Sequence, residues 1–404
     1  MSINKKFPIL HTKINGHDLV YFDNAATTQK PQVMIDALVE FYQKYNANVH
    51  RSLNPLADTA TQKYEETRLV VADFLSAKKQ EIIFTRNTTE SINLVAKTFG
   101  RGFLKAGDVV LLSIAEHHSN IVPWLQLKEE IGIKLEYISL DKNGYLDFEA
   151  AKKILDNKKV KFLSIQAASN VFGSIHDYRE ILKLAKAKNI FTLLDVAQIA
   201  GHESINVQEL ACDFLVFSAH KVFGPTGVGV LYGRKDLLQM MPAFLGGGEM
   251  IDRVLKDNFT SAELPHKFEA GTPNIADVIA FKSSLDFIKN LTWDYIQKIE
   301  QELTDYLWQE MLKLDFIDIY GQNISGRHLP IISFNLKNAH AHDVAEILGE
   351  QAIIVRAGQH CTQILHESLG VPATVRVSLT IYNTKKEIDI LIKNLKLIYN
   401  KFKV

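Results

Sequence analysis

The amino-acid sequence predicts an α/β fold: a large domain with a mainly parallel, seven-stranded sheet, followed by a smaller α+β domain at the C-terminus. Three observations support this prediction. The chain has 404 residues, which is more than a single hydrophobic core usually organises. Through its middle, short apolar segments alternate with helical patterns, as in parallel α/β sheets. Beyond about residue 285, strands become sparser and a long helical pattern begins.

Seven short segments in the middle of the chain are predicted to be strands of one sheet. Most are apolar and rich in β-branched or aromatic residues, as expected for strands that are buried on both faces. The strands are Glu81–Thr85, Val109–Ile114, Leu135–Ser139, Lys161–Gln166, Phe191–Val196, Phe214–Ser218 and Gly229–Tyr232, and the helices predicted among them are Thr89–Phe99, Ser119–Ile131 and Tyr178–Lys188.

The C-terminal part of the chain has a different pattern. A long helix is predicted over Trp293–Leu314. Apolar residues recur on one face of this helix, at Ile296, Ile299, Leu303 and Leu307. The remaining predicted elements are the strands Pro330–Asn335 and Thr374–Leu379 and the helices Ala341–Glu350 and Lys386–Phe402.

These patterns divide the chain into three parts. We expect an N-terminal segment over residues 1–30 that packs with the small domain, and a large ligand-binding domain over residues 31–285. A small domain over residues 286–404 carries the loop with Cys361. The division follows the change from alternating strands and helices to the long helical pattern.

The composition restricts the class of protein. Lys plus Arg total 46, equal to Asp plus Glu, so the overall charge does not favour a nucleic-acid partner or an acidic surface. The only two cysteines, Cys212 and Cys361, cannot form a disulfide framework and favour a reducing compartment. We find no secretory signal and no apolar run of about 18 residues, so we expect a cytoplasmic protein without membrane association.

Polar residues gather where the predicted strands end. In an open parallel sheet, ligands bind at the carboxyl ends of the strands, and five of these ends carry small residues mixed with polar and charged ones. Together they predict a site for a small polar, phosphorylated ligand at one edge of the sheet. The five segments are RNTTES (86–91), AEHHSN (115–120), AASNVFGS (167–174), DVAQ (195–198) and SAHKVFGPTGVG (218–229).

Two of these strand ends carry residues with two interpretations each. Thr88, Thr89 and Glu90 begin a predicted helix. They form a simple N-cap, or they bind phosphate together with the free backbone N–H groups. Asp195 ends an apolar strand. It caps the next turn, or it faces a cation such as the pyridinium nitrogen of a cofactor.

Lys221 directly follows a predicted buried strand, although lysine prefers solvated positions. One interpretation is a surface lysine on a loop. The other is a desolvated amine with a lowered pKa, which suits Schiff-base formation followed by proton transfer. Ser218 and His220 are candidates for hydrogen bonds to a phosphate beside it.

Patterns for other ligands are weak. His117 and His118 lack a third ligand at metal-site spacing, so no metal site is expected. One of these histidines is expected to cap a turn or lie in the core, and the other could stack on a cofactor ring. The glycines of GPTGVGVLYG (224–233) precede a strand instead of opening a helix, which excludes the dinucleotide fingerprint, and a nucleotide-hydrolysis motif is missing.

The C-terminal part adds a thiol and two guanidinium groups. Cys361 lies in RAGQHCT (356–362) and is predicted to be an exposed loop thiol, although most isolated cysteines are inert. Cys212, in ELACDFLVF, is predicted to fill the core. Arg356 and Arg376 clamp a carboxylate through two hydrogen bonds, or they form surface ion pairs.

These segments together resemble a known family. The chain is similar to the class V, fold-type I enzymes that use pyridoxal 5'-phosphate (PLP), and more narrowly to the group II cysteine desulfurases of the SufS type. The resemblance spans nearly the whole chain and is specific, because class V aminotransferases share the lysine region but not RAGQHC. The matching segments are YFDNAATTQKP, NANVHRS, FTRNTTESINLVA, EHHSNIVPW, SNVFGS, DVAQ, FSAHKVFGPTGVGVLYG, GGGEMI, FEAGTPN, RAGQHC and VRVSLTIYNT.

The resemblance implies a role for each candidate residue. Lys221 would hold PLP as a Schiff base, and Asp195 would face the pyridinium nitrogen. His117 would stack on the ring and serve as a proton donor, and Cys361 would be the nucleophile that takes sulfur. The other implied contacts are Gln198 with the phenolic oxygen; Thr88, Thr89, Ser218 and His220 with the phosphate; Thr272 with the phosphate of a second subunit; and Asn170, Arg356 and Arg376 with the substrate carboxylate.

The implied reaction converts L-cysteine to L-alanine and leaves a persulfide on Cys361. A homodimer would then pass the sulfur to an acceptor protein of SufE or SufU type for iron–sulfur cluster assembly. His360 or a positive loop environment would favour the Cys361 thiolate. Three alternatives stay open: selenocysteine lyase (on L-selenocysteine) or cysteine-sulfinate activity at the same site, a non-catalytic sulfur-carrier scaffold, and an ordinary class V aminotransferase in which Cys361 is incidental.

Overall fold

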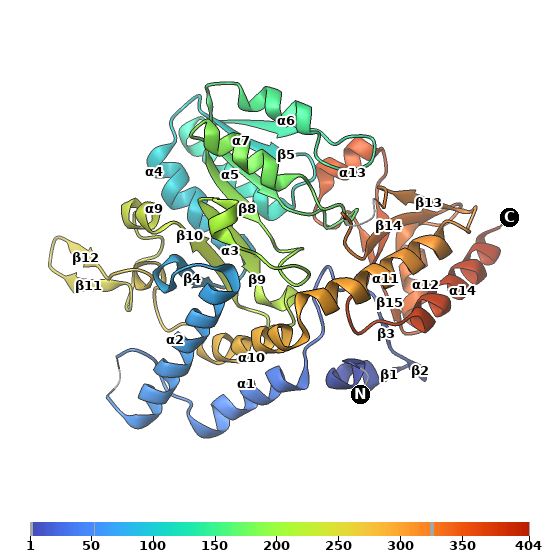
Figure 1. Cartoon of the computed structure of the whole chain (residues 1–404), viewed down its shortest axis with the longest axis horizontal. Coiled ribbons are helices and arrows are strands. Elements are labelled where there is room, and N and C mark those ends of the chain that lie inside the picture. Colours follow the sequence, from blue (N-terminus) through green and yellow to red (C-terminus); the bar gives the residue numbers. More distant parts are fainter. Residues whose placement is uncertain (1–2, 52, 324–326, 404) are drawn as a thin grey trace.

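The computed structural model describes residues 3–51, 53–323 and 327–403, and its centre is a mixed, mostly parallel sheet of seven strands (Figure 1). The strand order is β4-β10-β9-β8-β7-β5-β6. Strand β10 runs antiparallel to β4 and β9, and the other pairs are parallel. All seven predicted strands are confirmed, each within one residue at either end. They are β4 (Ile82–Thr85), β5 (Val109–Ser113), β6 (Lys134–Ile138), β7 (Val160–Gln166), β8 (Phe191–Asp195), β9 (Phe214–Ser218) and β10 (Gly229–Gly233).

The sheet is buried on both faces, because successive side chains of a strand point to opposite sides. In β5, Val109 and Leu111 pack into one apolar cluster, while Val110 and Leu112 pack into another. Helices α3 (Thr88–Val95) and α5 (Val122–Ile131) contribute to the second cluster, and α1 (Gln32–Lys44), α2 (Pro55–Leu75), α6 (Phe148–Leu155), α7 (Tyr178–Ala187) and α10 (Ile275–Leu291) contribute to the first.

The structure refines the predicted helices of this layer. The helix expected over Thr89–Phe99 begins at Thr88, and its last turn, Ala96–Gly100, is a π-helix. The helix expected over Ser119–Ile131 divides into a 3₁₀ turn, η5 (His118–Asn120), and α5. The division falls where Pro123 enters, because proline lacks a backbone N–H and fits only the first turn of a helix. None of the described helices is long and apolar enough to cross a bilayer.

A four-stranded antiparallel sheet, in the order β13-β14-β17-β16, forms a second layer around its own apolar cluster. Its predicted strands and its last two predicted helices are confirmed within one residue, whereas the long helix α11 ends at Met311 rather than Leu314. The elements are β13 (Ile317–Tyr320), β14 (Ile331–Leu336), β16 (Arg356–Gly358), β17 (Thr374–Ser378), α11 (Trp293–Met311), α12 (Ala341–Glu350), α13 (Gln363–Leu369) and α14 (Lys385–Phe402).

The N-terminal residues contact both layers. β3 (Val20–Tyr21) pairs in parallel with β15 (Ile353–Ile354), while the ring of Phe7 packs on Phe223. Helix α10 runs through residue 285, and Leu285 and Ile288 pack into the apolar cluster of the central sheet. The three-part division of the chain stays a prediction.

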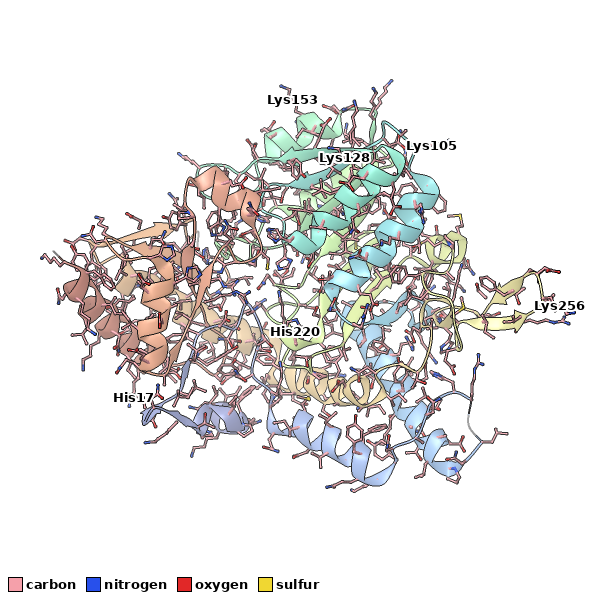
Figure 2. The ribbon with its side chains drawn as sticks, turned by 180° about the vertical axis from the view of Figure 1, so that it is seen from behind. His17, Lys105, Lys128, Lys153, His220 and Lys256 are labelled. Atoms are coloured by element: carbon pink, nitrogen blue, oxygen red, sulfur yellow. The ribbon has the colours of Figure 1, made fainter. Side chains whose placement is uncertain are left out.

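Short elements complete the described chain. The hairpin of β11 and β12 projects away from both layers (Figure 1), with Lys256 near its tip, whereas His220 lies near the middle of the molecule (Figure 2). These elements are η1 (Ile3–Lys6), η2 (Pro8–His11), β1 (Lys13–Ile14), β2 (His17–Asp18), η3 (Lys79–Glu81), α4 (Arg101–Phe103), α8 (Val207–Leu210), η6 (Ala219–Lys221), α9 (Lys235–Met240), β11 (Ile251–Val254), β12 (Phe259–Ser261) and η7 (His266–Phe268).

Candidate active site

The polar strand ends meet in one cavity of about 260 Å³ at the carboxyl edge of the central sheet. Strands β4, β5, β7, β8 and β9 contribute residues that end or follow them, as the sequence predicted. The N-terminal segment and the second layer form the other walls. Every predicted site residue except Thr272 lines the cavity: Thr88, Thr89, His117, Asn170, Asp195, Gln198, Ser218, His220, Lys221, Arg356, Cys361 and Arg376.

Lys221 ends η6, the 3₁₀ turn that follows β9. The amine of Lys30 donates a hydrogen bond to the His220 carbonyl at 3.0 Å and fixes this turn. Burial lowers the pKa of the Lys221 amine to about 8, and the nearby Asp195 carboxylate partly opposes the shift. Lys221 is therefore a cavity residue with an easily deprotonated amine, and its interpretation as a solvated loop lysine is wrong.

Asp195 is the last residue of β8 and is only 6% exposed. Its Oδ1 accepts a hydrogen bond from the backbone N–H of Ala197 at 2.9 Å, so the residue caps the next turn and also lines the cavity. Burial raises the pKa of this carboxyl group, while the Ala197 hydrogen bond and the Lys221 charge lower it. Gln198 follows on the same turn, and its Nε2 donates to the Ala25 carbonyl at 3.1 Å.

The start of α3 faces the cavity, but its N-cap is Asn87, whose side chain accepts from the backbone N–H of Glu90 at 3.0 Å. The simple N-cap interpretation of Thr88 and Thr89 is therefore wrong. The hydroxyl of Ser218 accepts from the Thr88 backbone N–H at 2.8 Å and lies 2.7 Å from the Thr88 hydroxyl. This contact brings the ends of β4 and β9 together and gathers hydroxyl groups at a helix N-terminus.

His117 follows β5, and its ring has a defined tautomer. The backbone N–H of Ser119 donates to Nδ1 at 3.1 Å, so Nδ1 is an acceptor and Nε2 carries the proton. The Ser119 hydroxyl, 2.9 Å from Nδ1, is bonded in turn to the Thr89 hydroxyl at 2.7 Å. Burial lowers the pKa of His117 to about 3, so the ring is neutral at physiological pH.

The loop that carries Cys361 is bonded to the end of β5 and to the segment after β7. The backbone N–H of His118 donates to the Cys361 carbonyl at 2.8 Å, and His118 Nε2 accepts from the Gln363 backbone at 3.0 Å. Nδ2 of Asn170 donates to the His360 carbonyl at 2.8 Å. His118 thus caps α13, the structural role that suited one of the two adjacent histidines.

The two cysteines have different surroundings. Cys361 is partly buried and lines the cavity, whereas Cys212 is 1% exposed and burial raises the pKa of its thiol to about 12, which confirms it as a core residue. Burial lowers the pKa of His360 to about 2, so this ring is neutral. The positive charge near Cys361 comes from Arg356 and Arg376.

Arg376 on β17 is 2% exposed, so its interpretation as a surface ion pair is wrong. Its Nη2 donates to Asp23 Oδ1 at 2.9 Å, and its Nη1 donates to the Asn170 carbonyl at 2.9 Å. Its Nε is buried without a partner among the described residues. Sequence reasoning missed Asp23, although it lies in YFDNAATTQKP, a segment that carried the resemblance.

Glu116 is a second residue that the sequence reasoning missed. It is fully buried next to the cavity residue His117, and burial raises the pKa of its carboxyl group to about 8. Its Oε1 accepts from the Ser113 hydroxyl at 2.5 Å and its Oε2 accepts from Asn120 Nδ2 at 2.8 Å. The segment AEHHSN was singled out, but a buried glutamate there has no pattern that separates it from a surface one.

Thr272 lies outside this cavity in the single chain. It lines a different cavity of about 790 Å³ together with Arg86, Glu90 and the apolar residues Phe244 and Leu245. Its predicted contact with a second subunit stays a prediction.

The chain matches the family described as Aminotransferase class-V over residues 20–391. A protein described as a probable cysteine desulfurase from Synechocystis sp. is 44% identical over 397 residues, which cover 98% of this chain and 94% of the relative. A cysteine desulfurase from Haloferax volcanii is 40% identical over 405 residues, covering 97% of this chain and 95% of the relative.

Solved structures are similar over the same length. The apo cysteine desulfurase from Thermococcus onnurineus NA1 has a TM-score of 0.93 and 38% identity, with 99% of this chain and 97% of that chain covered. The cysteine desulfurase CsdA from Escherichia coli, in an S-sulfonic acid form, has a TM-score of 0.90 and 35% identity, with 99% and 98% covered. A C-DES mutant with glycine linked to its PLP cofactor shares the fold at a TM-score of 0.84 and 20% identity.

Proposed function

Because the chain belongs to the class V aminotransferase family and is a PLP-dependent cysteine desulfurase, we propose that Cys361 takes the sulfur of L-cysteine and that L-alanine leaves. One observation carries the proposal: Lys221, Asp195 and Cys361, from separate parts of the chain, line the same cavity. An aminotransferase needs the lysine and the aspartate, whereas a sulfur acceptor needs the thiol as well. The presence of all three also argues against a non-catalytic sulfur-carrier scaffold.

The residues around Lys221 fit PLP. An amine with a pKa of about 8 is readily deprotonated and can attack the aldehyde of the cofactor. The Asp195 carboxylate is buried and uses Oδ1 for the Ala197 hydrogen bond, so its other oxygen suits the pyridinium nitrogen. Hydroxyl groups at the N-terminus of α3 suit the phosphate. When bound, PLP stabilises the negative charge that develops on the substrate α-carbon. The proposed cofactor contacts are Thr88, Thr89, His117, Asp195, Gln198, Ser218, His220 and Lys221.

Two residues transfer protons in the proposed reaction. The Lys221 amine removes the α-proton of the substrate, because its lowered pKa lets it accept a proton and release it again near neutral pH. His117 holds a proton at Nε2, since the Ser119 backbone N–H occupies Nδ1. We assign the donation of this proton to the carbon that becomes the alanine methyl group.

The guanidinium groups of Arg356 and Arg376 are proposed to bind the substrate carboxylate. Nε of Arg376 is buried without a partner among the described residues, so a carboxylate oxygen satisfies it. The Asn170 amide already donates to the His360 carbonyl at 2.8 Å, so its contact with substrate requires the amide group to turn. Arg376 is therefore the principal carboxylate ligand.

The sulfur step balances without an external oxidant. The Cys361 thiolate attacks the substrate sulfur and a sulfur–sulfur bond forms. The carbon–sulfur bond of the substrate breaks, and its electron pair stays with the carbon, which takes up a proton. The sulfur is thereby oxidised to the persulfide level, and the carbon is reduced to the methyl group of L-alanine.

Finer assignments rest on the resemblance to group II desulfurases of the SufS type. We propose that the protein is a cytoplasmic homodimer in which Thr272 of each chain reaches the cofactor phosphate of the other. The persulfide sulfur then passes to an acceptor of SufE or SufU type for iron–sulfur cluster assembly. Activity on L-selenocysteine or on cysteine sulfinate is a second candidate, because the same residues would serve it.

The test is an assay of L-alanine and sulfide after adding L-cysteine and a reductant to the purified protein with PLP. Both products should appear in equal amounts. The Cys361→Ala variant should retain the visible absorbance of the bound cofactor and lose turnover, while Cys212→Ala keeps both. Undiminished turnover in Cys361→Ala would contradict the role of the thiol. Covalently attached cofactor in Lys221→Ala would contradict the role of the lysine.

A further inference from the structure

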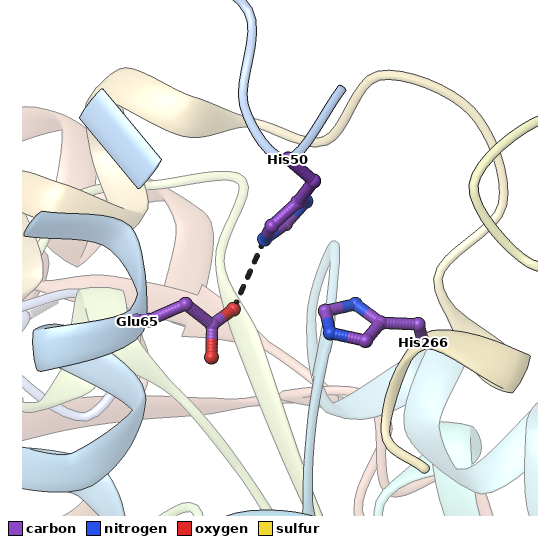
Figure 3. A group of neighbouring side chains, drawn as sticks. All are labelled: His50, Glu65 and His266. Carbon is purple, nitrogen blue, oxygen red and sulfur yellow. Dashed lines mark hydrogen bonds and ion pairs between the residues drawn. The ribbon is translucent and has the colours of Figure 1, made fainter. Parts of the chain in front are cut away.

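A cluster away from the candidate active site brings together two imidazoles and one carboxylate. His50 lies between α1 and α2, Glu65 lies on α2, and His266 begins η7; the three side chains point toward one another (Figure 3). One nitrogen or oxygen atom from each lies within 4.8 Å of the other two. All three residues are partly buried. No metal site was expected from the sequence, where only His117 and His118 were considered as ligands. His50, Glu65 and His266 come from segments too far apart to form a spacing motif.

The surroundings of His50 suit a metal-binding tautomer. Its Nε2 lies 3.1 Å from Glu65 Oε1, on the side that faces the cluster. Its Nδ1 lies 3.8 Å from Oε2 of Glu249, whose other oxygen is held by Arg51 Nε at 3.2 Å. When an ion takes the place of the hydrogen bond between His50 and Glu65, the ring proton moves to Nδ1, beside the Glu249 carboxylate. A carboxylate on the outer nitrogen is the usual second partner of a metal-bound histidine.

His266 is available as a ligand. Its ring lies edge-on to the His50 ring, with the centroids 4.8 Å apart, and its side chain has no hydrogen bond or ion pair among the residues that the structure describes. Its rotation to meet an ion breaks no existing polar contact.

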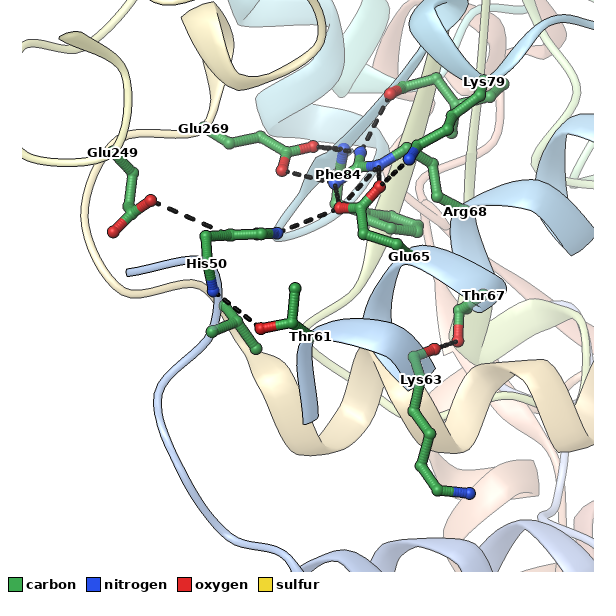
Figure 4. A network of polar contacts seen from close by, with 12 residues as sticks. His50, Thr61, Lys63, Glu65, Thr67, Arg68, Lys79, Phe84, Glu249 and Glu269 are labelled. Carbon is green, nitrogen blue, oxygen red and sulfur yellow. Dashed lines mark hydrogen bonds and ion pairs between the residues drawn. The ribbon is translucent and has the colours of Figure 1, made fainter. Parts of the chain in front are cut away.

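Two cations, Arg68 and Lys79, lie beside Glu65 (Figure 4). Arg68 is fully buried, and it is neutralised by Glu269, which accepts two hydrogen bonds at 2.6 and 2.8 Å. Lys79 lies 2.8 Å from Glu65 Oε2, but its side chain is 39% exposed, so it can turn into the solvent. Oε1 of Glu65 faces His50 and also accepts a hydrogen bond from Nη2 of Arg68 at 3.2 Å, so an ion would share this oxygen with Arg68.

We propose that His50, Glu65 and His266 bind a divalent transition ion of the zinc class, with one position left to water. Two imidazoles and a carboxylate are a common zinc ligand set. Ligand atoms at zinc bond lengths lie about 3.4 Å apart, so the longest separation in the cluster, at most 4.8 Å, would contract by up to about 1.4 Å. Mg²⁺ and Ca²⁺ prefer oxygen ligands and are not expected to bind. The ion would link α2 to the segment that runs from η7 to Thr272.

The test uses the full-length, PLP-loaded protein after treatment with a chelator, dialysed against Zn²⁺ with metal analysis. The wild-type protein should bind Zn²⁺. The affinity for Zn²⁺ should fall at least about tenfold in His266→Ala and about tenfold in Glu249→Gln. His340→Ala is the matched control, since His340 and His342 form another close pair of imidazoles, with ring centroids 5.0 Å apart. Cys361→Ala controls for binding at the active-site thiol. Co²⁺ in place of Zn²⁺ should show visible absorption bands of four-coordinate geometry.

Two results would overturn the proposal. One is an unchanged zinc affinity in His266→Ala. The other is a wild-type protein whose only bound zinc disappears with His340→Ala or Cys361→Ala. His266 makes no polar side-chain contact that the structure describes, so His266→Ala should keep its cofactor absorbance and its metal-free thermal unfolding midpoint. Those two measurements separate loss of the ion from loss of the fold.

Discussion

At the scale of single residues, the environment of Lys221 decides the chemistry of the cavity. Burial lowers the pKa of its amine to about 8, while Asp195 acts in the opposite direction and Arg376 adds to the lowering. The resulting amine exists in both protonation states near neutral pH, which a residue that first binds a cofactor and then moves a proton requires.

The pH dependence of cofactor uptake follows from this value. Because only the neutral amine attacks the PLP aldehyde, the rate of covalent attachment to the apo protein should rise with pH and level off above about pH 8. Stopped-flow absorbance between pH 6.5 and 10 measures it. A rate that keeps rising toward pH 10.5, the ordinary pKa of lysine, would show that Lys221 is solvated.

The Asp195→Asn variant removes the negative charge of this side chain and keeps nearly the same shape, so it tests the role of the charge. An asparagine oxygen can still accept from the Ala197 N–H, but the negative charge is lost. The pKa of Lys221 should then fall, because the Asp195 charge raises it, and turnover should drop about 100-fold or more as the pyridinium loses its partner. Steady-state kinetics and cofactor absorbance against pH test this. Asp236→Asn, at a surface ion pair, is the control and should change neither.

At the scale of elements, the loop between β16 and α13 positions the thiol. His360 and Cys361 both have positive φ angles, 52° and 60°, a conformation that non-glycine residues rarely adopt without support. The hydrogen bonds from His118 and Asn170 to the two carbonyls supply that support. The loop is therefore held by the ends of two strands of the central sheet.

The His118→Ala variant should weaken this support. It leaves the Gln363 backbone N–H without its acceptor, which costs about 1 kcal/mol, so alanine formation should slow about fivefold. The cofactor absorbance and its response to L-cysteine should persist, because His118 does not line the cavity. His118→Gln, whose side-chain oxygen can accept the same hydrogen bond, should restore most of the rate. Equal losses in both variants would contradict the positioning role.

The sequence predicted some elements better than others, for physical reasons. The strands of the central sheet are short, apolar and buried on both faces, so composition alone located them. The clustering of their polar ends followed from the parallel order. The N-cap of α3 is Asn87 and not the threonines after it; an asparagine followed three residues later by a glutamate, here Glu90, is a helix-start pattern that the prediction overlooked. The Arg376–Asp23 ion pair joins residues from opposite ends of the chain, and no local pattern reveals such a pair.

At the scale of the whole molecule, α11 connects the two layers. Ile296 belongs to the apolar cluster of the central sheet and Leu303 to that of the second sheet. Between them, Glu300 is 4% exposed and lies 2.7 Å from His202 Nδ1. The Thr380 hydroxyl donates to the other oxygen of Glu300 at 2.9 Å. Residues of both layers line the cavity, so the contacts at this junction fix the position of one cavity wall relative to the other.

The junction should make stability depend on pH. The Glu300 carboxylate raises the pKa of His202 above its ordinary value of 6.5, against the effect of burial, so the folded state holds the proton more tightly. This contribution is complete below about pH 6.5 and is lost as pH rises through the raised pKa. Urea unfolding at pH 6 and at pH 9 measures this loss. Between the two pH values, the free energy of unfolding of the wild type should fall by about 1 kcal/mol more than that of His202→Gln. Parallel changes in both proteins would contradict this account.

The most direct test of the central claim is mass spectrometry of the protein after one equivalent of L-cysteine is added without reductant. The peptide with Cys361 should gain the mass of one sulfur atom, L-alanine should appear in the same amount, and the peptide with Cys212 should be unchanged. The Lys221→Ala variant should gain no sulfur. Alanine formation without added mass on Cys361, or added mass on Cys212 instead, would contradict the assignment of Cys361 as the sulfur acceptor.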